Sequence, residues 1–253
     1  MTVLPHQLHG SGAHHVIALH GWFGDRTSYE PLMPWIDDTA FTWALMDQRG
    51  YGDARHIGGD FTIAEVAKDA VALADHLGWT TFSVVGHSMG GAVAQRIAAD
   101  VPQRLRSLVG ITPVPASGAG MDVTVREMFA GAKEDSALRR AIISGSTGDR
   151  LPAAWLDYMV AHSVACSTKE AFGAYLPSWA DADFHDDVAG NPAPALFLAG
   201  EHDPGLSADF LRTTVASWFP ASELKILANA GHYPMDETPL ALLALVESFL
   251  ARH

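Results

Sequence analysis

Short apolar runs alternate with longer stretches of helical periodicity along most of the chain. Six near-continuous runs of apolar and β-branched residues predict buried strands, at residues 14–21, 41–47, 81–87, 105–114, 193–200 and 223–230. Continuous apolar runs are typical of strands covered on both faces of a sheet. Strands that alternate with helices indicate an α/β fold, so we expect a mostly parallel, doubly wound sheet.

Two helices are predicted with defined starts. Residues 62–77 carry an apolar stripe at helical spacing, and Thr62 with Glu65 three residues later forms a capping box. At the C-terminus a second stripe follows Thr238, which we expect to cap the helix, and Pro239, which suits a first helical position.

The alternation stops between residues 114 and 190, where no convincing strand occurs. Four helices are predicted there, at 121–132, 135–145, 152–164 and 167–180, separated by Gly, Pro and Ser. We therefore expect a core of residues 1–113 and 191–253 and a helical insertion at 114–190. The insertion is rich in bulky apolar side chains, and about half of these are expected to be packing residues only.

Composition and charge narrow the possible functions. The chain has 253 residues, 48% of them hydrophobic, and a net charge of −13, so nucleic acid is an unfavourable partner. Cys166 is the one cysteine and cannot form an intramolecular disulfide. No secretory signal is evident at the start, and the apolar run at 240–246 is too short to span a membrane. These features predict a soluble cytoplasmic protein.

A G-x-S-x-G pattern follows the third predicted strand and leads directly into a helix. Gly86 and Gly90 leave room for a sharp turn that lifts the Ser88 hydroxyl above the sheet edge. The helix N-terminus adds partial positive charge beside that hydroxyl. The pattern is weak by itself, but its position between a strand and a helix makes Ser88 a candidate nucleophile.

A serine nucleophile needs a histidine base and a carboxylate that orients it. Asp203 follows the strand at 193–200, and His232 follows the last strand. The carboxyl ends of parallel strands meet at one sheet edge, so these side chains can converge on Ser88. The order Ser, Asp, His is the one expected for this arrangement.

Two backbone N–H groups are also needed to bind a developing oxyanion. One is expected from Met89, directly after the nucleophile. The other is expected from the loop after the first long strand, where Trp22 is our choice and Phe23 the alternative.

These motifs together resemble the α/β-hydrolase superfamily over essentially the whole chain. The resemblance rests on HGWFG at 20–24, DQRGYGDA at 47–54, GHSMGG at 86–91, GEHDP at 200–204 and AGHYPMDETP at 230–239. It implies that residues 114–190 form a lid over the active site, that the turn at 47–52 is structural or lines the pocket, and that no cofactor is used. About ten residues precede the first long strand, so the two leading strands of the full fold are expected to be shortened or partly missing.

Some alternatives are disfavoured by the residues present. Asp122 at the start of the insertion is a rival for the acid, since some relatives carry it there, but it lacks the strand-end position of Asp203. No phosphate-binding loop, dinucleotide fingerprint or common zinc pattern occurs, so we predict no metal. Epoxide hydrolases and haloalkane dehalogenases of the superfamily use an Asp nucleophile, whereas position 88 is Ser.

The sequence therefore predicts a serine hydrolase that cleaves a carboxylic ester or lactone of a neutral small-molecule substrate. The substrate would contact four aromatic side chains of the lid, Trp155, Tyr158, Phe172 and Trp179. The insertion between 121 and 187 carries a net charge of −5, which disfavours polyanionic substrates. A C–C bond hydrolase of ring-cleavage products, a perhydrolase side activity and a small-molecule receptor remain open alternatives.

Overall fold

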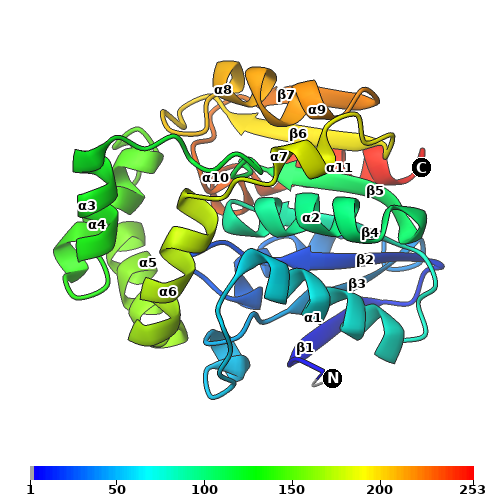
Figure 1. The fold of residues 1–253 in the computed structure, drawn as a ribbon, viewed down its shortest axis with the longest axis horizontal. Coiled ribbons are helices and arrows are strands. Elements are labelled where there is room, and N and C mark those ends of the chain that lie inside the picture. The colour runs from blue at the N-terminus through cyan, green and yellow to red at the C-terminus, as the bar shows by residue number, and fades with distance from the viewer. Residues whose placement is uncertain (1–2) are drawn as a thin grey trace.

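A seven-stranded sheet organises the chain in the computed structural model, which describes residues 3–253 (Figure 1). The strand order is β1-β3-β2-β4-β5-β6-β7, and only β1 runs antiparallel to its neighbour. The strands are β1 His6–Gly10, β2 His14–Leu19, β3 Phe41–Met46, β4 Phe82–His87, β5 Leu105–Ile111, β6 Ala195–Gly200 and β7 Ser222–Leu227. The predicted α/β fold with a mostly parallel sheet is confirmed.

The strand β1 is the one leading strand among the described residues. It pairs with β3, from His6 opposite Met46 to Gly10 opposite Thr42. The apolar pattern did not predict it, because its five residues are partly or fully exposed at the sheet edge.

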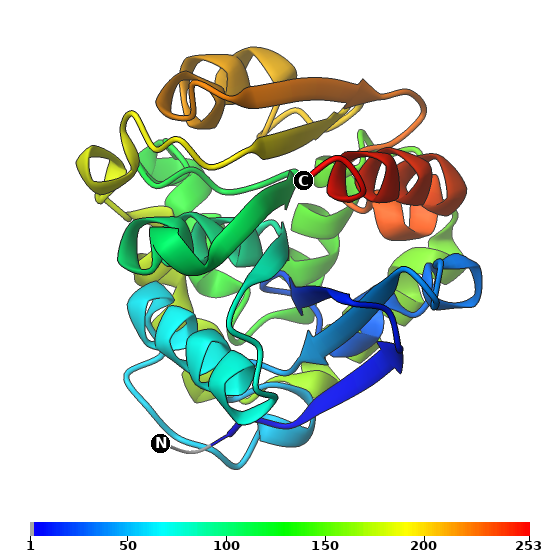
Figure 2. The same ribbon diagram turned by 90° about the vertical axis from the view of Figure 1, so that its right-hand side faces the viewer.

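Helices cover both faces of the sheet (Figure 2). The core helices are α1 Ile63–His76, α2 Met89–Asp100, α8 Ala208–Thr213, α9 Val215–Trp218, α10 Pro234–Glu237 and α11 Pro239–Leu250. Figure 2 shows α1 and α2 on one face and α11, in red, on the other. Short 3₁₀ helices lie at Arg26–Tyr29, Met33–Trp35, Gly52–Ala54 and Pro102–Arg104.

Alternation along each strand supplies one apolar cluster to each face. On β2, Ile17 and Leu19 join the cluster under α1 and α2, whereas Val16 and Ala18 join the cluster under α11. Successive side chains of a strand point to opposite faces, so a continuous apolar run fills both clusters. This burial fixes the register of the strands and holds their carboxyl ends at one edge.

Of the two helix N-caps predicted from the sequence, the structure has the one at Thr62 and lacks the one at Thr238. The Thr62 side chain accepts a hydrogen bond from the Glu65 N–H at 3.1 Å, as the capping box predicts. Thr238 precedes α11 but makes no capping bond with its side chain. The reason is that α10 runs directly into α11, which leaves Thr238 with a φ of −146° and a ψ of 53° rather than the extended backbone of a capping residue.

Residues between β5 and β6 form a helical insert at the end of the sheet toward which the parallel strands point (Figure 1). The helices there are α3 Val123–Gly131, α4 Ser136–Ser146, α5 Ala153–Cys166 and α6 Lys169–Ala180, and α7 His185–Val188 lies back against α2. The first four correspond to the predicted helices, and α7 was not predicted. No helix among the described residues is long and apolar enough to cross a membrane.

Candidate active site

Ser88 lies in a sharp turn between β4 and α2. Its φ of 54° and ψ of −117° are a combination that L residues rarely adopt, at a cost of roughly 1–3 kcal/mol. A Cβ on Gly86 would lie 2.1 Å from the Gly90 carbonyl oxygen, and one on Gly90 would lie 2.3 Å from the Leu19 carbonyl oxygen. The two glycines are therefore required by the close approach of the backbone, and the strained turn presents the hydroxyl beside the N-terminus of α2.

His232 connects Ser88 to Asp203. Its Nε2 lies 2.9 Å from the Ser88 Oγ, and its Nδ1 lies 2.7 Å from the Asp203 Oδ2. The other carboxylate oxygen of Asp203 accepts hydrogen bonds from the Gly205 and Leu206 N–H groups, both at 3.0 Å. The carboxylate is buried and held on both oxygens, so it can fix the imidazole with Nδ1 protonated and Nε2 free to accept a proton.

Two backbone amides close to Ser88, those of Met89 and Trp22, have no hydrogen-bond partner in residues 3–253. Met89 is the first residue of α2, so its N–H has no acceptor within the helix. The Trp22 N–H likewise donates to no described residue. Both residues are buried beside Ser88, and amides of this kind can bind an oxyanion.

The loop from His20 to Asp25, here called the oxyanion loop, is anchored by the turn that follows β3. The Tyr51 hydroxyl donates to the Trp22 carbonyl oxygen at 2.9 Å, and the Gln48 side chain donates to the His20 carbonyl oxygen at 2.7 Å. Buried Asp47 pairs with Arg26 at the far end of the loop. This turn supports the loop from behind and does not line the cavity described below.

The helical insert holds the same loop from the front through an aromatic stack. The Trp22 ring lies 3.8 Å from the Phe172 ring at 17°, and its Nε1 donates to the Phe172 carbonyl oxygen at 2.8 Å. The Cζ atom of the Arg139 guanidinium lies over the Phe172 ring, 3.7 Å from the ring centroid. Arg139 is buried and donates to the carbonyl oxygens of Ala132 and Ser163. Aromatic stacking and cation–π contact therefore link the insert to the loop.

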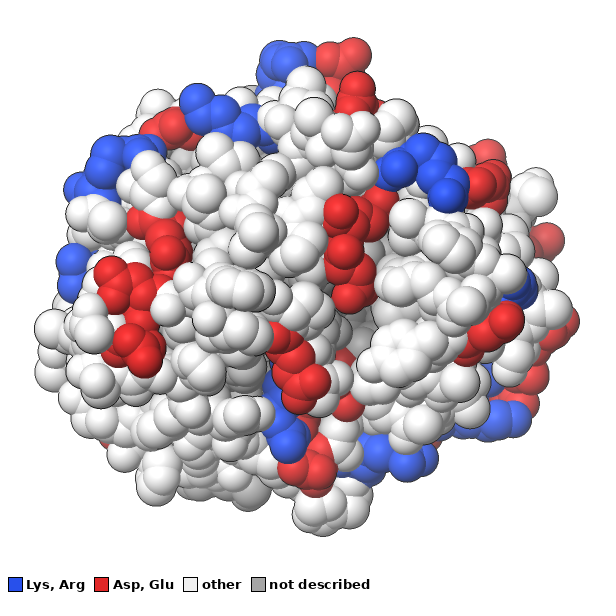
Figure 3. Space-filling view, turned by 180° about the vertical axis from the view of Figure 1, so that it is seen from behind, with Lys and Arg blue, Asp and Glu red and all other residues white. Residues whose placement is uncertain are grey.

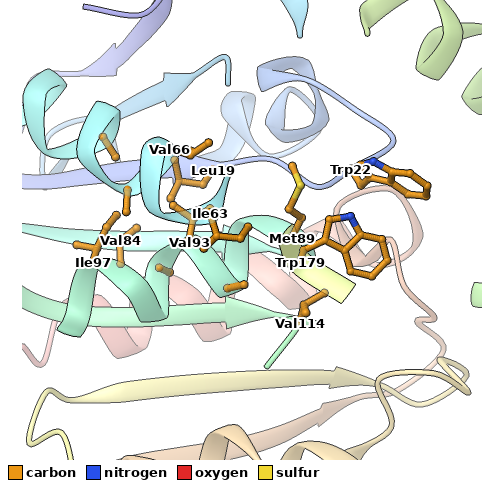
Figure 4. Packing of buried hydrophobic residues seen from close by; sticks show 14 of the residues in the cluster. Leu19, Trp22, Ile63, Val66, Val84, Met89, Val93, Ile97, Val114 and Trp179 are labelled. Carbon is orange, nitrogen blue, oxygen red and sulfur yellow. The ribbon is translucent and has the colours of Figure 1, made fainter. Parts of the chain in front are cut away.

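A cavity of about 400 Å³ opens beside Ser88 between the core and the insert. Its wall is mainly apolar and includes Trp22, Phe23, Val114, Met121, Val125, Met128, Phe129, Ile142, Trp179, Leu206 and Tyr233. Figure 4 shows Trp22, Met89 and Trp179 together at the end of the apolar cluster where α2 begins. Among residues 3–253 the acidic and histidine side chains that line it are Asp122, Asp203 and His232, and no Lys or Arg lines it.

The four aromatic residues predicted to contact substrate lie in different places. Trp179 lines the cavity. Phe172 is fully buried against Trp22, Trp155 packs edge-on against Tyr233 at 5.4 Å, and Tyr158 is 61% exposed and stacked on His162. These three residues do not line the cavity, because their faces of α5 and α6 are covered by other side chains or point to solvent.

Several cavity residues were not singled out from the sequence. Val125 and Ile142 line the wall from α3 and α4, and Leu206 lines it from the loop after β6. The helical periodicity predicted that these positions are apolar, but it gives no signal for which apolar face meets a cavity.

Asp122 stabilises the first turn of α3 in the insert. Its carboxylate accepts a hydrogen bond from the Val125 N–H at 2.9 Å and caps α3. It lies at the cavity wall but forms no hydrogen bond with His232. The structure brings Asp203, and not Asp122, to the imidazole.

One group of possible metal ligands was missed from the sequence. Ligand atoms of Asp25, His162 and Cys166 lie within 4.8 Å of one another, and the last two are four residues apart on α5. Asp25 already accepts hydrogen bonds from Thr27, and its Oδ1 lies 3.3 Å from the His162 Nε2. The hydrogen bond that His162 donates to the Asp25 carboxylate raises the pKa of His162. We interpret the group as an ion pair between the oxyanion loop and α5.

The fold and the site define the class of protein. Residues 14–239 match the model of the alpha/beta hydrolase fold family, and the chain belongs to that family. It is 25% identical to the pimeloyl-[acyl-carrier protein] methyl ester esterase of Serratia marcescens, over 100% of both chains. It is 28% identical to the 2-hydroxymuconate semialdehyde hydrolase of Pseudomonas putida, over 81% of this chain and 75% of that one.

Other matches extend the range of similar proteins. The chain spans 28% of the acetyltransferase component of the acetoin cleaving system from Cupriavidus necator, with 35% identity over 105 residues. Among solved structures, an esterase from Thermogutta terrifontis aligns with a TM-score of 0.85 and 22% identity over 98% of this chain and 93% of that one. That similarity concerns the fold. Together the matches establish an α/β-hydrolase whose substrate the family does not specify.

Proposed function

We propose that this protein is a serine hydrolase that cleaves a carboxylic ester or lactone through an acyl-enzyme on Ser88. The observation that carries the proposal is the hydrogen-bonded chain from Ser88 through His232 to Asp203. Ser88 attacks the carbonyl carbon, His232 takes the hydroxyl proton and passes it to the leaving alcohol, and Asp203 stabilises the imidazolium. The amides of Met89 and Trp22 bind the oxyanion.

The cavity favours a neutral substrate of small to medium size. Its volume of about 400 Å³ is at the lower end of ligand pockets, which span roughly 300–1,000 Å³. A carboxylate or phosphate on the substrate would meet Asp122 and no compensating Lys or Arg on the wall. Acidic side chains also gather along the middle of the face shown in Figure 3, consistent with the net charge of −13. Long-range repulsion of anions therefore adds to the local preference of the cavity for a neutral substrate.

A C–C bond hydrolase is the second candidate, because the similar protein from Pseudomonas putida acts on 2-hydroxymuconate semialdehyde. The same chain of Ser88, His232 and Asp203 could serve that reaction. The absence of cations from the described cavity wall weighs against a substrate that carries a carboxylate. We regard the ester or lactone reaction as the better match to this cavity. The helical insert would act in it as a lid, with Trp179 on the substrate.

The proposal is tested with Ser88→Ala and a panel of neutral esters, lactones, acyl-CoA and ring-cleavage products. Loss of the nucleophile should lower kcat for p-nitrophenyl esters by roughly 10⁶ while the protein stays folded. A fluorophosphonate probe should label the wild type and not the variant. Residual activity of more than a few per cent in Ser88→Ala would show that another residue is the nucleophile. Turnover limited to a few cycles with every substrate would favour a receptor.

A further inference from the structure

A second, much smaller cavity lies beside Ser88. It has a volume of about 10 Å³ and shares Ser88 and His232 with the large cavity. The rest of its wall includes Gly21, Gly24, Ser28, His87 and Met159, none of which lines the large cavity. A single water needs roughly 10–15 Å³ of such space, so the small cavity matches one water molecule.

Two polar side-chain atoms of the small cavity, the His87 Nδ1 and the Ser28 Oγ, have no protein partner among residues 3–253. His87 is 3% exposed, and its Nε2 lies 2.7 Å from the His232 carbonyl oxygen. A carbonyl oxygen can only accept, so Nε2 carries the proton and donates it. Burial lowers the pKa of His87 far below its usual value, which keeps the ring neutral and its Nδ1 a hydrogen-bond acceptor.

No described residue donates to the Nδ1 of His87, and the Ser28 Oγ likewise makes no hydrogen bond within residues 3–253. Buried waters typically bind to polar groups that lack a protein partner. A water in the small cavity can donate to His87 and exchange a hydrogen bond with Ser28.

Two glycines of the oxyanion loop keep the space between these groups open. A Cβ on Gly21 would lie 2.8 Å from the His87 Nδ1 and 3.1 Å from the Ser88 Cβ. A Cβ on Gly24 would lie 2.3 Å from the Ser28 Oγ. Any side chain at either position would therefore press on a polar atom of the wall.

We propose that the small cavity binds the water that hydrolyses the acyl-enzyme, with His87 and Ser28 as positioning residues. The inference rests on the proposed acyl-enzyme at Ser88. When the acyl group fills the large cavity, the small cavity can still supply water from the side of His87. The water oxygen attacks the acyl carbon while His232 accepts its proton. The bond to the Ser88 Oγ then breaks, that oxygen takes the proton back from His232, and the carboxylic acid leaves.

The experiment separates acylation from deacylation in Ser28→Ala and Ser28→Val. The first variant removes one partner of the water, and the second also fills the cavity with apolar atoms. With p-nitrophenyl acetate, stopped-flow measurement gives the burst rate for acylation and the steady-state rate for deacylation. We expect burst rates within about twofold of wild type and a steady-state rate lowered about tenfold in Ser28→Val, the effect of losing about one hydrogen bond.

A second measurement is the partition of the acyl group between water and methanol. This ratio would not change if Ser28 only stabilised the fold. At fixed methanol concentration, the ratio of methyl ester to free acid should rise in Ser28→Val. Methanol is too large for the cavity of about 10 Å³ and must reach the acyl carbon by the route of the leaving alcohol, so the substitution should slow the attack of water more than that of methanol. The matched control Val125→Ala alters the wall of the large cavity and should change acyl preference without that deacylation defect. If Ser28→Val does not fold, Ser28→Ala should show the same shifts to a smaller extent.

The possible failures are distinguishable. A wild type without a burst and without fluorophosphonate labelling of Ser88 would remove the proposed function itself. A wild type that hydrolyses esters normally, with Ser28 variants that leave deacylation and partition unchanged, would overturn only the water site. Equal slowing of acylation and deacylation would also overturn it, because that result indicates a general disturbance of the oxyanion loop.

Discussion

Asp203→Asn gives the sharpest test of how the imidazole is oriented, because the structure determines which way the new amide must face. The Oδ1 of Asp203 accepts two backbone N–H groups, and its Oδ2 faces the Nδ1 of His232. An asparagine keeps both backbone hydrogen bonds only with its oxygen in the Oδ1 place. Its NH₂ group then points at Nδ1 and makes that nitrogen an acceptor.

The opposite orientation of the amide is more costly. It would place the NH₂ group against the N–H groups of Gly205 and Leu206 and lose two hydrogen bonds, at roughly 1–3 kcal/mol for each donor left without a partner. In the favoured orientation of the amide, the imidazole proton is on Nε2 and points at Ser88. The Nε2 atom then has no free lone pair with which to accept the serine proton. We therefore expect kcat to fall by roughly 10⁴. That factor corresponds to about 5 kcal/mol of transition-state stabilisation.

The assay compares kcat and KM for p-nitrophenyl acetate in wild type, Asp203→Asn and the control Asp122→Asn. Asp122 caps α3, and Asn caps a helix about as well as Asp, so this variant should lose little stability and little activity. Circular dichroism and thermal unfolding would establish that both variants fold. Asp203→Asn with more than a tenth of wild-type activity, or a larger loss in Asp122→Asn, would refute the assignment of the acid.

Three further variants test other contacts. Trp179→Ala should change kcat/KM among acyl chain lengths, whereas Tyr158→Ala should leave the ranking unchanged; equal effects would contradict the cavity wall described above. Phe172→Leu should lower kcat about 2- to 12-fold for all esters with little change in KM, because one aromatic contact of roughly 0.5–1.5 kcal/mol holds the oxyanion loop. His162→Gln should destabilise the protein more at pH 6 than at pH 9 in urea unfolding, because the hydrogen bond to Asp25 raises the pKa of His162 above 6.5. That contribution is complete below pH 6.5 and is lost as the pH rises through the raised pKa, so a difference that grows with pH would contradict it.

The sequence predicted the sheet well because its signal is local. Six continuous apolar runs each became a parallel strand, and burial on both faces leaves little alternative for such runs. The strand β1 was missed because an exposed edge strand of five residues needs few apolar side chains. Short helices such as α7 carry too few turns for a periodic pattern.

The arrangement of the candidate site residues was also predictable, since motifs at strand ends are placed by the parallel topology. Ser88, Asp203 and His232 lie at the carboxyl ends of β4, β6 and β7, and the topology alone brings these ends together. The contacts of the insert were not predictable in the same way. Periodicity identifies an apolar face, but the neighbour that covers it depends on the packing of distant elements, as with Phe172 against Trp22.

The stacking of Trp22 against the insert has a consequence for engineering this enzyme family. The ring of Trp22 also stacks on Phe129 at 5.8 Å, so the loop after β2 shares its aromatic core with both α3 and α6. The insert is therefore not an exchangeable module, because a graft from a relative would bring different partners to that ring and disturb the amide beside Ser88. Substrate range should instead be altered at single wall positions such as Val125 and Ile142, which line the cavity and are not members of the stack.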